Sequence, residues 1–135
     1  MSRTTDTPIQ QRFTDIDPFL HVNNVAQQMY FDLGKTDFYA QVFGGDVLMQ
    51  GRLRILTVST STSYLDQVRL GDALHVTTTC ERIGNKSMTL FQQLFAGDRL
   101  CSESRSVMVA FDFEAQQGVP VPEAWREALL REPEA

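Results

Sequence analysis

The polar residues best suited to chemistry gather in one short segment, residues 15–24, which reads Asp-Ile-Asp-Pro-Phe-Leu-His-Val-Asn-Asn. An apolar stretch with helical spacing follows it directly. The first backbone N–H groups of a helix have no partner within the helix and carry a positive partial charge, so they can stabilise an oxyanion. Asp17, one loop away, could attack a carbonyl carbon or activate water, while the N–H near Asn24 polarises that carbonyl. The segment therefore predicts a minimal hydrolytic site.

The same residues also have a structural interpretation. Asp and Asn side chains before a helix commonly form turns and caps. Asp15 stands on the strand side of the bend at Pro18, so it is expected to serve the loop. His21 could orient Asp17 or hydrogen-bond loop backbone, and the sequence leaves both roles open. His75 lies in an alternating strand pattern with no partner nearby in sequence, and it is not expected in the site.

The apolar stretch of residues 25–43 predicts a long helix that is buried on most of its faces. Asn24 and Gln27 are expected to form its N-cap and capping box, and Gly44-Gly45 to end it. Gly34 lies inside this helix, where glycine costs about 1 kcal/mol relative to alanine. The apolar side chains recur at spacings of three, four and seven at Val25, Met29, Leu33, Ala40 and Phe43.

After residue 52 the hydrophobic period changes to two, which predicts long antiparallel strands. Gly84-Asn85 and Gly97-Asp98 each predict a two-residue hairpin. A short first strand is expected at residues 9–14, with frayed residues before it, and a terminal helix at residues 122–130. A helix this apolar can only be covered if the sheet curls around it. The long strands are expected at residues 55–64, 74–81 and 88–95, and in a run that ends at Phe113.

Composition narrows the class of protein. The chain has 135 residues, 42% of them apolar, which fits one domain with an ordered core over about residues 8–130. Its net charge of -5 disfavours nucleic acid as a partner. Cys80 and Cys101 lack the spacing of a metal site and are expected to be packing residues in a reducing cytoplasm. The sequence shows no leader and no apolar run long enough for membrane insertion, which predicts a cytoplasmic protein.

Several segments resemble a known family, the hot-dog acyl-CoA thioesterases of the 4-hydroxybenzoyl-CoA thioesterase group. The resemblance covers about residues 9–130. The pattern Asp-x-Asp-x-x-x-His-Val-Asn-Asn is closer to the fatty-acyl branch than to the aromatic-acyl members. The matching segments are Arg12-Phe13-Thr14-Asp15-Ile16-Asp17, His21-Val22-Asn23-Asn24, Tyr64-Leu65, Arg69-Leu70-Gly71-Asp72, Gly84-Asn85-Lys86-Ser87, the strand from Ser104 to Phe113, and Val121-Pro122.

This resemblance implies an α+β hot-dog fold, in which a curved antiparallel sheet of about five strands wraps around one long central helix. It implies that Asp17 is the catalytic carboxylate and that the backbone N–H of Asn24 is the oxyanion donor. It adds a further role for His21, which could touch the thioester. Whether Asp17 attacks the thioester carbon or serves as a general base for water stays open.

The implied substrate is an acyl-CoA thioester, with a medium or long fatty acyl chain, and no separate cofactor is expected. The chain has neither a Walker loop nor a GxGxxG turn, so scattered cations must hold the phosphates of CoA. Arg82 and Lys86 flank the Gly84-Asn85 turn, and in relatives cations near this turn reach the nucleotide, often from a neighbouring subunit. Arg69 and Arg54 are weaker candidates. The alternative for each is a solvated surface charge.

The resemblance also implies association, because relatives form homodimers that assemble into homotetramers. A sheet with uncovered edges should pair with a copy of itself. The alternatives to acyl-CoA hydrolysis are hydrolysis of acyl-carrier-protein thioesters, a hydratase of the same fold, and a non-catalytic acyl-CoA-binding protein. No metal is expected, because the two histidines are isolated and the carboxylates scattered.

Overall fold

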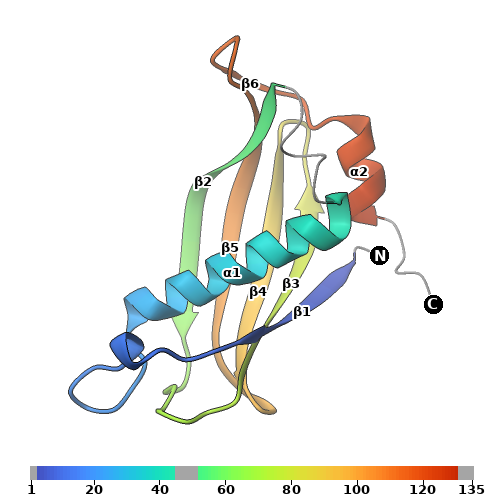
Figure 1. Cartoon of the computed structure of the whole chain (residues 1–135). Helices are drawn as coiled ribbons and strands as arrows, with labels where there is room; N and C mark the ends of the chain where they lie inside the picture. The colour runs from blue at the N-terminus through green and yellow to red at the C-terminus, as the bar shows by residue number, and fades with distance from the viewer. Residues whose placement is uncertain (1–2, 45–51, 131–135) are drawn as a thin grey trace.

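One curved antiparallel sheet carries a long helix across its inner face (Figure 1). The computed structural model describes residues 3–44 and 52–130. In this part of the chain the strand order is β1-β3-β4-β5-β2, and the short β6 also pairs with β5. This is the predicted hot-dog fold. The elements are β1 (Thr4–Ile9), a 3-10 turn (Phe13–Asp15), α1 (Asn24–Phe43), β2 (Leu53–Tyr64), β3 (Leu74–Ile83), β4 (Ser87–Ala96), β5 (Arg99–Asp112), β6 (Gln117–Val119) and α2 (Glu123–Leu130).

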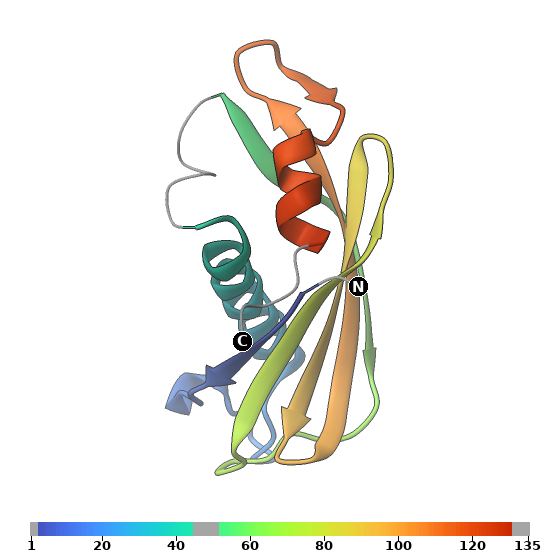
Figure 2. The ribbon, with the colours of Figure 1, turned by 90° about the vertical axis from the view of Figure 1, so that its right-hand side faces the viewer.

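Helix α1 is buried on the face that meets the sheet, and Figure 2 shows the sheet curving around it. Because alternate residues of a strand point to one face, β3 and β4 each supply a row of mainly apolar side chains to this contact. The buried helix residues include Ala26, Tyr30, Phe31, Phe38, Val42 and Phe43. Two clusters result, one at each end of α1, and α2 closes the cluster at the C-terminal end with Trp125 and Leu129.

The prediction that α1 is buried on most of its faces is wrong in one respect. Val25, Met29 and Leu33 are 68%, 47% and 55% exposed, so much of the stripe expected to meet the core faces outward. The reason is that a second apolar stripe, centred on Tyr30, Phe31 and Phe38, competes for the sheet and is larger. The molecule consequently presents an uncovered apolar stripe on the outside of its central helix.

Gly34 is required by the packing of α1 on the sheet. A Cβ at this position would lie 2.7 Å from Val76 Cγ1 and 2.9 Å from Gln92 Nε2. The helix backbone therefore approaches β3 and β4 more closely than any residue with a side chain allows. The unfavourable helix propensity predicted for Gly34 is offset by this close contact.

The first strand lies earlier than predicted. β1 runs from Thr4 to Ile9 and pairs with β3, so residues expected to be frayed are part of the sheet, while part of the predicted strand forms the 3-10 turn. In the alternating pattern of this strand, Thr5 and Thr7 are buried together with Ile9, which a scale based on polarity does not predict.

Both hairpins are present. The Gly97-Asp98 turn has two residues, as predicted, and Gly97 takes a positive φ of 60°. The other turn is longer than predicted, because β3 ends at Ile83 and β4 begins at Ser87. Gly44 ends α1 as expected, whereas Gly45 and the end of the chain after residue 130 lie outside the described residues. Among the residues described, no helix is long and apolar enough to cross a membrane.

Candidate active site

Asp17 lies in a tight loop that holds its carboxylate in one orientation. Asp17 Oδ1 accepts hydrogen bonds from the backbone N–H groups of Phe19, at 2.9 Å, and His21, at 3.1 Å. The Asp17 N–H in turn donates to the His21 carbonyl at 2.8 Å. Asp17 Oδ2 has no hydrogen-bond partner among the described residues. One oxygen of the carboxylate thus forms the turn, and the other is available for chemistry.

Helix α1 begins beside this loop, one residue earlier than predicted. Its N-cap is Asn23, whose side-chain oxygen accepts from the Ala26 N–H at 2.7 Å, so Asn24 is the first helical residue and not the cap. The predicted capping box is also wrong, because the Gln27 side chain turns toward β5 and accepts from Ser102 Oγ at 2.8 Å. Within the described structure, the Asn24 N–H has no acceptor. It is therefore free to bind an oxygen that develops negative charge.

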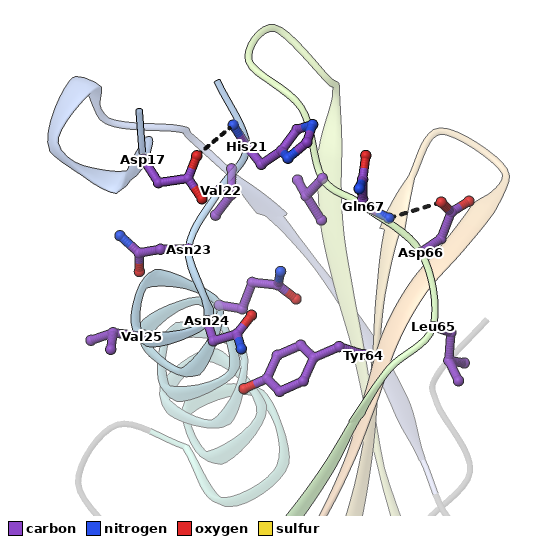
Figure 3. Close-up of a pocket in the computed structure, with 12 residues that line it drawn as sticks. Asp17, His21, Val22, Asn23, Asn24, Val25, Tyr64, Leu65, Asp66 and Gln67 are labelled. Atoms are coloured by element: carbon purple, nitrogen blue, oxygen red, sulfur yellow. Dashed lines mark hydrogen bonds between the residues drawn. The ribbon is translucent and has the colours of Figure 1, made fainter. Parts of the chain in front are cut away.

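These groups line one pocket of about 650 Å³ (Figure 3). Asp17 and His21 stand on one side, the start of α1 forms the floor, and the segment after β2 forms the opposite side. The structure therefore brings together three residues that the sequence singled out. The lining consists of Asp17, His21, Val22, Asn23, Asn24, Val25, Gln27 and residues 64–68.

His21 contacts Asp17 through its backbone. In Figure 3 the imidazole points away from the Asp17 carboxylate, and the dashed line starts at the backbone nitrogen. Within the described part of the chain, no hydrogen bond to the imidazole is present. The backbone of His21 orients Asp17, and the ring is left free at the wall of the pocket.

Asp15 serves the loop, as expected from the sequence. Its side chain is buried and accepts from Tyr30 Oη at 2.6 Å and from the Arg12 guanidinium at 2.9 Å. Burial raises the pKa of Asp15, but the hydrogen bonds from Tyr30 and Arg12 outweigh it, so the net shift is downward. The Asp15 carbonyl also accepts from the Asn23 N–H at 2.9 Å. Asp15 thus fixes the loop to the start of α1.

The far wall of the pocket, residues 64–68, was not assigned to the site from the sequence. Asp66 supplies a second carboxylate, but it pairs with the Arg99 guanidinium at 3.1 Å, and this hydrogen bond lowers the Asp66 pKa. Tyr64 Oη accepts from Gln28 Nε2 at 3.0 Å. The residues of a loop after a strand show no regular spacing in the sequence. Their place in the pocket therefore follows only from the position of β2 beside α1 in the structure. Asp17 is the carboxylate of the pocket with a free oxygen among the described groups.

Arg82 and Lys86 lie far from this pocket in the same chain. They flank the turn between β3 and β4, at the opposite end of the sheet from the Asp17 loop (Figure 1). A strand as long as β3 separates the two sites by roughly 30 Å at about 3.3 Å per residue. Among the described residues neither side chain forms an ion pair, so both charges are available to a ligand. The carbonyls of Gly84 and Asn85 accept hydrogen bonds from the Arg126 guanidinium of α2. These bonds fix the turn between β3 and β4.

Other candidate groups lie outside the pocket. Cys80 and Cys101 are buried, and burial raises the pKa of Cys80 to about 11, so its thiol is neutral at pH 7. His75 bonds to Asp6 and the Gly97 carbonyl on the outer side of the sheet. In the parts of the chain that the structure describes, no group of three or more His, Cys, Asp or Glu side chains could hold a metal ion.

In sequence and in fold, the chain is similar to several known proteins. The family model described as the thioesterase-like superfamily matches residues 11–129. The structure is similar to a predicted thioesterase from Bacillus stearothermophilus, with a TM-score of 0.84 and 26% identity over 98% of this chain and 100% of the other. It is also similar to a thioesterase from Thermus thermophilus complexed with coenzyme A and zinc, with a TM-score of 0.79 and 27% identity over 92% and 90%. The uncharacterized protein YsmA from Bacillus subtilis is 27% identical over 90% of this chain and 82% of its own.

Proposed function

The chain belongs to the thioesterase-like superfamily, and on that premise we propose that it hydrolyses acyl-CoA thioesters to a free acid and CoA. One observation carries the proposal. A carboxylate oxygen of Asp17 and the backbone N–H of Asn24, both without a partner among the described residues, line the same pocket. The first can act on a carbonyl carbon, and the second can bind the oxygen that becomes negative.

In the proposed reaction the thioester carbonyl oxygen accepts the Asn24 N–H, and the helix N-terminus stabilises its growing charge. Asp17 acts in one of two ways. Its Oδ2 attacks the carbonyl carbon and expels the CoA thiolate, and water then cleaves the mixed anhydride; or it takes a proton from water, and the resulting hydroxide attacks. Both routes give the acid and CoA. The free imidazole of His21 is proposed to contact the thioester beside the reacting carbon.

The proposed substrate has a fatty acyl chain of medium or long length. Its nucleotide phosphates are proposed to bind Arg82 and Lys86 of a neighbouring subunit, because the same chain holds these cations at the far end of the sheet. This arrangement requires a homodimer, which we propose assembles further into a homotetramer. The CoA bound in the Thermus thermophilus thioesterase supports a CoA thioester as the substrate.

The test is a screen for release of the CoA thiol from saturated acyl-CoAs of increasing chain length. Hydrolysis should release thiol and acid in equal amounts. The same reactions with unsaturated acyl-CoAs, followed by the absorbance of the conjugated thioester, detect hydration in place of hydrolysis. Acyl groups carried on acyl carrier protein form a third arm. Thiol release from none of these substrates, despite measurable binding of acyl-CoA, would show a binding protein and overturn the proposal.

A further inference from the structure

The sheet surface next to the pocket is polar where the packing of a helix on a sheet predicts apolar residues. Three successive pairs across β2 and β5 carry hydroxyl groups on the face toward α1. The burial of β5 alternates along its length, and its buried side meets the helix side chain of Gln27. Polar groups at a buried position cost free energy unless they are hydrogen-bonded, so six hydroxyl residues on this face of the sheet are unusual. The pairs are Tyr64 with Ser102, Thr62 with Ser104, and Thr60 with Ser106.

This polar strip, as we call these three pairs, is continuous with the pocket. Gln27 and Tyr64 line the pocket, and Gln27 Oε1 accepts from Ser102 Oγ at 2.8 Å. The next residue of α1, Gln28, donates from Nε2 to Tyr64 Oη at 3.0 Å and to Thr62 Oγ1 at 2.9 Å. Thr62 then meets Ser104, with 2.9 Å between their hydroxyl oxygens. A run of hydrogen-bonding groups thus leads from the pocket along the sheet.

Helix α1 does not seal the strip. It packs more closely on β1 and β3 than on β2 and β5, and two glutamine side chains bridge the wider side. Along β2, Thr62 is half-buried and Thr60 is exposed. Each hydroxyl has one donor and two acceptor positions, so the pairs retain capacity for a further partner. The β2 side of the strip is therefore accessible to a chain that enters from the pocket, while the β5 serines, at most 2% exposed, lie beneath it, two of them bonded to β2 hydroxyls.

A buried acceptor lies in register with the middle of the strip. Gln92 of β4 pairs with Ser104 and is 1% exposed. Its Nε2 donates to the Phe31 carbonyl at 2.8 Å and to Thr78 Oγ1 at 3.0 Å, while its Oε1 has no partner among the described residues. An unpaired buried acceptor is costly, and an O–H donor would relieve the cost.

The polar character ends further along the same strands. After the bulge in β2, Thr57 pairs with Met108 and Ile55 with Ala110, and this part of the sheet belongs to the apolar cluster shared with α2. Every second residue of a strand adds roughly 7 Å, so the three polar pairs cover the part of the sheet that lies nearest the pocket. The surface therefore changes from hydroxyl-lined near the reacting carbon to apolar beyond it.

From this pattern we infer that the acyl group of the substrate carries a hydroxyl on a carbon close to the thioester. The inference rests on the proposed function and narrows its substrate class to hydroxylated fatty acyl thioesters. A hydroxyl can bond to the hydrogen-bonding positions that the strip leaves open, whereas a plain methylene chain would cover these positions without a partner. The apolar stretch beyond the strip fits the remaining alkyl chain.

The experiment compares matched pairs of thioesters that differ by one hydroxyl: hexanoyl-CoA with 3-hydroxyhexanoyl-CoA, and decanoyl-CoA with 3-hydroxydecanoyl-CoA. We expect kcat/KM to favour the hydroxylated member of each pair by about tenfold or more, since a site built to bond a hydroxyl rejects the analogue without it. Non-hydrolysable thioether analogues of the same pairs should show the same preference in their dissociation constants.

Two variants locate the effect. Thr62→Val and Ser104→Ala keep nearly the same volume but remove hydroxyls of the strip, so each should reduce the preference for the hydroxylated substrate. Thr89→Val makes the same change on the opposite face of the sheet and should leave the preference unaltered. Equal or better use of the plain acyl chain would overturn the inference while leaving thioester hydrolysis intact. Tighter binding of the hydroxylated thioether, together with no hydrolysis of any of the thioesters, would support the inference and contradict the proposed hydrolysis.

Discussion

Two aspartates two positions apart serve different purposes because their surroundings differ. Asp15 is 2% exposed, and Arg12 and Tyr30 use its carboxylate oxygens. Asp17 uses one oxygen for its own turn and presents the other to the pocket. From the sequence, the bend at Pro18 predicted different roles for the two aspartates, but it did not show why their roles differ. The hydrogen bonds assign a structural role to Asp15 and leave Asp17 for chemistry.

A third side chain gives a prediction about pH. His75 contacts an acceptor at each ring nitrogen, Asp6 Oδ1 at 2.7 Å and the Gly97 carbonyl at 3.0 Å, and only the imidazolium can donate to both. Phe95 stacks on the ring. Burial lowers the pKa of His75, but the bonds to Gly97 and Asp6 and the nearby charge of Asp98 outweigh it, so the pKa is raised.

Because the folded-state pKa is raised, the stabilisation is complete below the ordinary histidine pKa of about 6.5 and is lost as pH rises through the folded value. Because the pair of His75 and Asp6 is partly exposed, we expect this stabilisation to be about 1 kcal/mol or less. Urea unfolding at pH 6 and pH 8.5 measures it. The free energy of unfolding should fall less over this interval in Asp6→Asn than in the parent protein. An identical fall in both proteins would show that the pair contributes no pH dependence.

At the scale of elements, the contact of α1 with the sheet predicts whether one substitution in the helix raises or lowers the free energy of unfolding. Gly34→Ala should improve helix propensity by about 1 kcal/mol, but its Cβ would lie 2.7 Å from Val76 Cγ1. Val76 is a β-branched core residue and cannot easily turn away. Overpacking of this kind typically costs about 1–3 kcal/mol, which exceeds the gain in helix propensity, so we expect a net loss of about 1 kcal/mol in the free energy of unfolding in urea.

The matched control is Thr36→Ala, on the exposed side of the same helix. It gains helix propensity without entering a contact, so its free energy of unfolding should stay equal to that of the parent or rise slightly. If Gly34→Ala is also neutral or stabilising, the close packing of α1 on β3 and β4 is not as the structure has it.

The elements show where reasoning from sequence succeeds. Period-two alternation predicted the long strands, because each strand is buried on one face only. The start of α1 was predicted one residue late, because Asn23 and Asn24 are equally good caps and only the loop geometry decides between them. The strand β1 was misplaced because its buried positions include two threonines. The polar strip could not be predicted, because its residues become neighbours only through the register of β2 against β5.

At the scale of the whole molecule, two uncovered surfaces predict association. β2 is an edge strand of the sheet, and Val25, Met29 and Leu33 leave an apolar stripe exposed on α1. Light scattering at micromolar concentration should report a dimer or tetramer. Leu33→Glu places a charge on a side chain that is 55% exposed, so the single chain should fold while association weakens. A monodisperse, active monomer of 15.3 kDa would contradict this prediction.

Association also decides how the CoA phosphates are held. If Arg82 and Lys86 of a neighbouring subunit bind them, the double change Arg82→Ala with Lys86→Ala should raise KM for acyl-CoA by about tenfold and leave kcat nearly unaltered, since the contact is the same in ground and transition states. The effect should shrink at high salt. Steady-state kinetics measures both constants.

Two controls accompany this pair of changes. A short acyl-pantetheine thioester lacks the nucleotide phosphates and should not respond to the double change. Arg105→Ala removes a cation that already pairs with Glu81 at 2.9 Å, so KM should hardly move. An unaltered KM for acyl-CoA in the double variant, or an equal effect on the pantetheine substrate, would place the phosphates elsewhere.

The catalytic role of Asp17 is tested most directly by the kcat for thiol release by Asp17→Asn, measured on the best acyl-CoA substrate of the parent protein. The amide oxygen of the substituted side chain can still accept from the Phe19 and His21 N–H groups, so the loop and the melting temperature should be preserved. Asp15→Asn is the control for structure, and it should lower the melting temperature because its buried bonds to Arg12 and Tyr30 weaken. We expect kcat of Asp17→Asn to fall by about 100-fold or more, because the carboxylate that acts on the thioester or on water is lost. A folded Asp17→Asn protein that releases thiol at the parent rate would contradict a catalytic role for the Asp17 carboxylate.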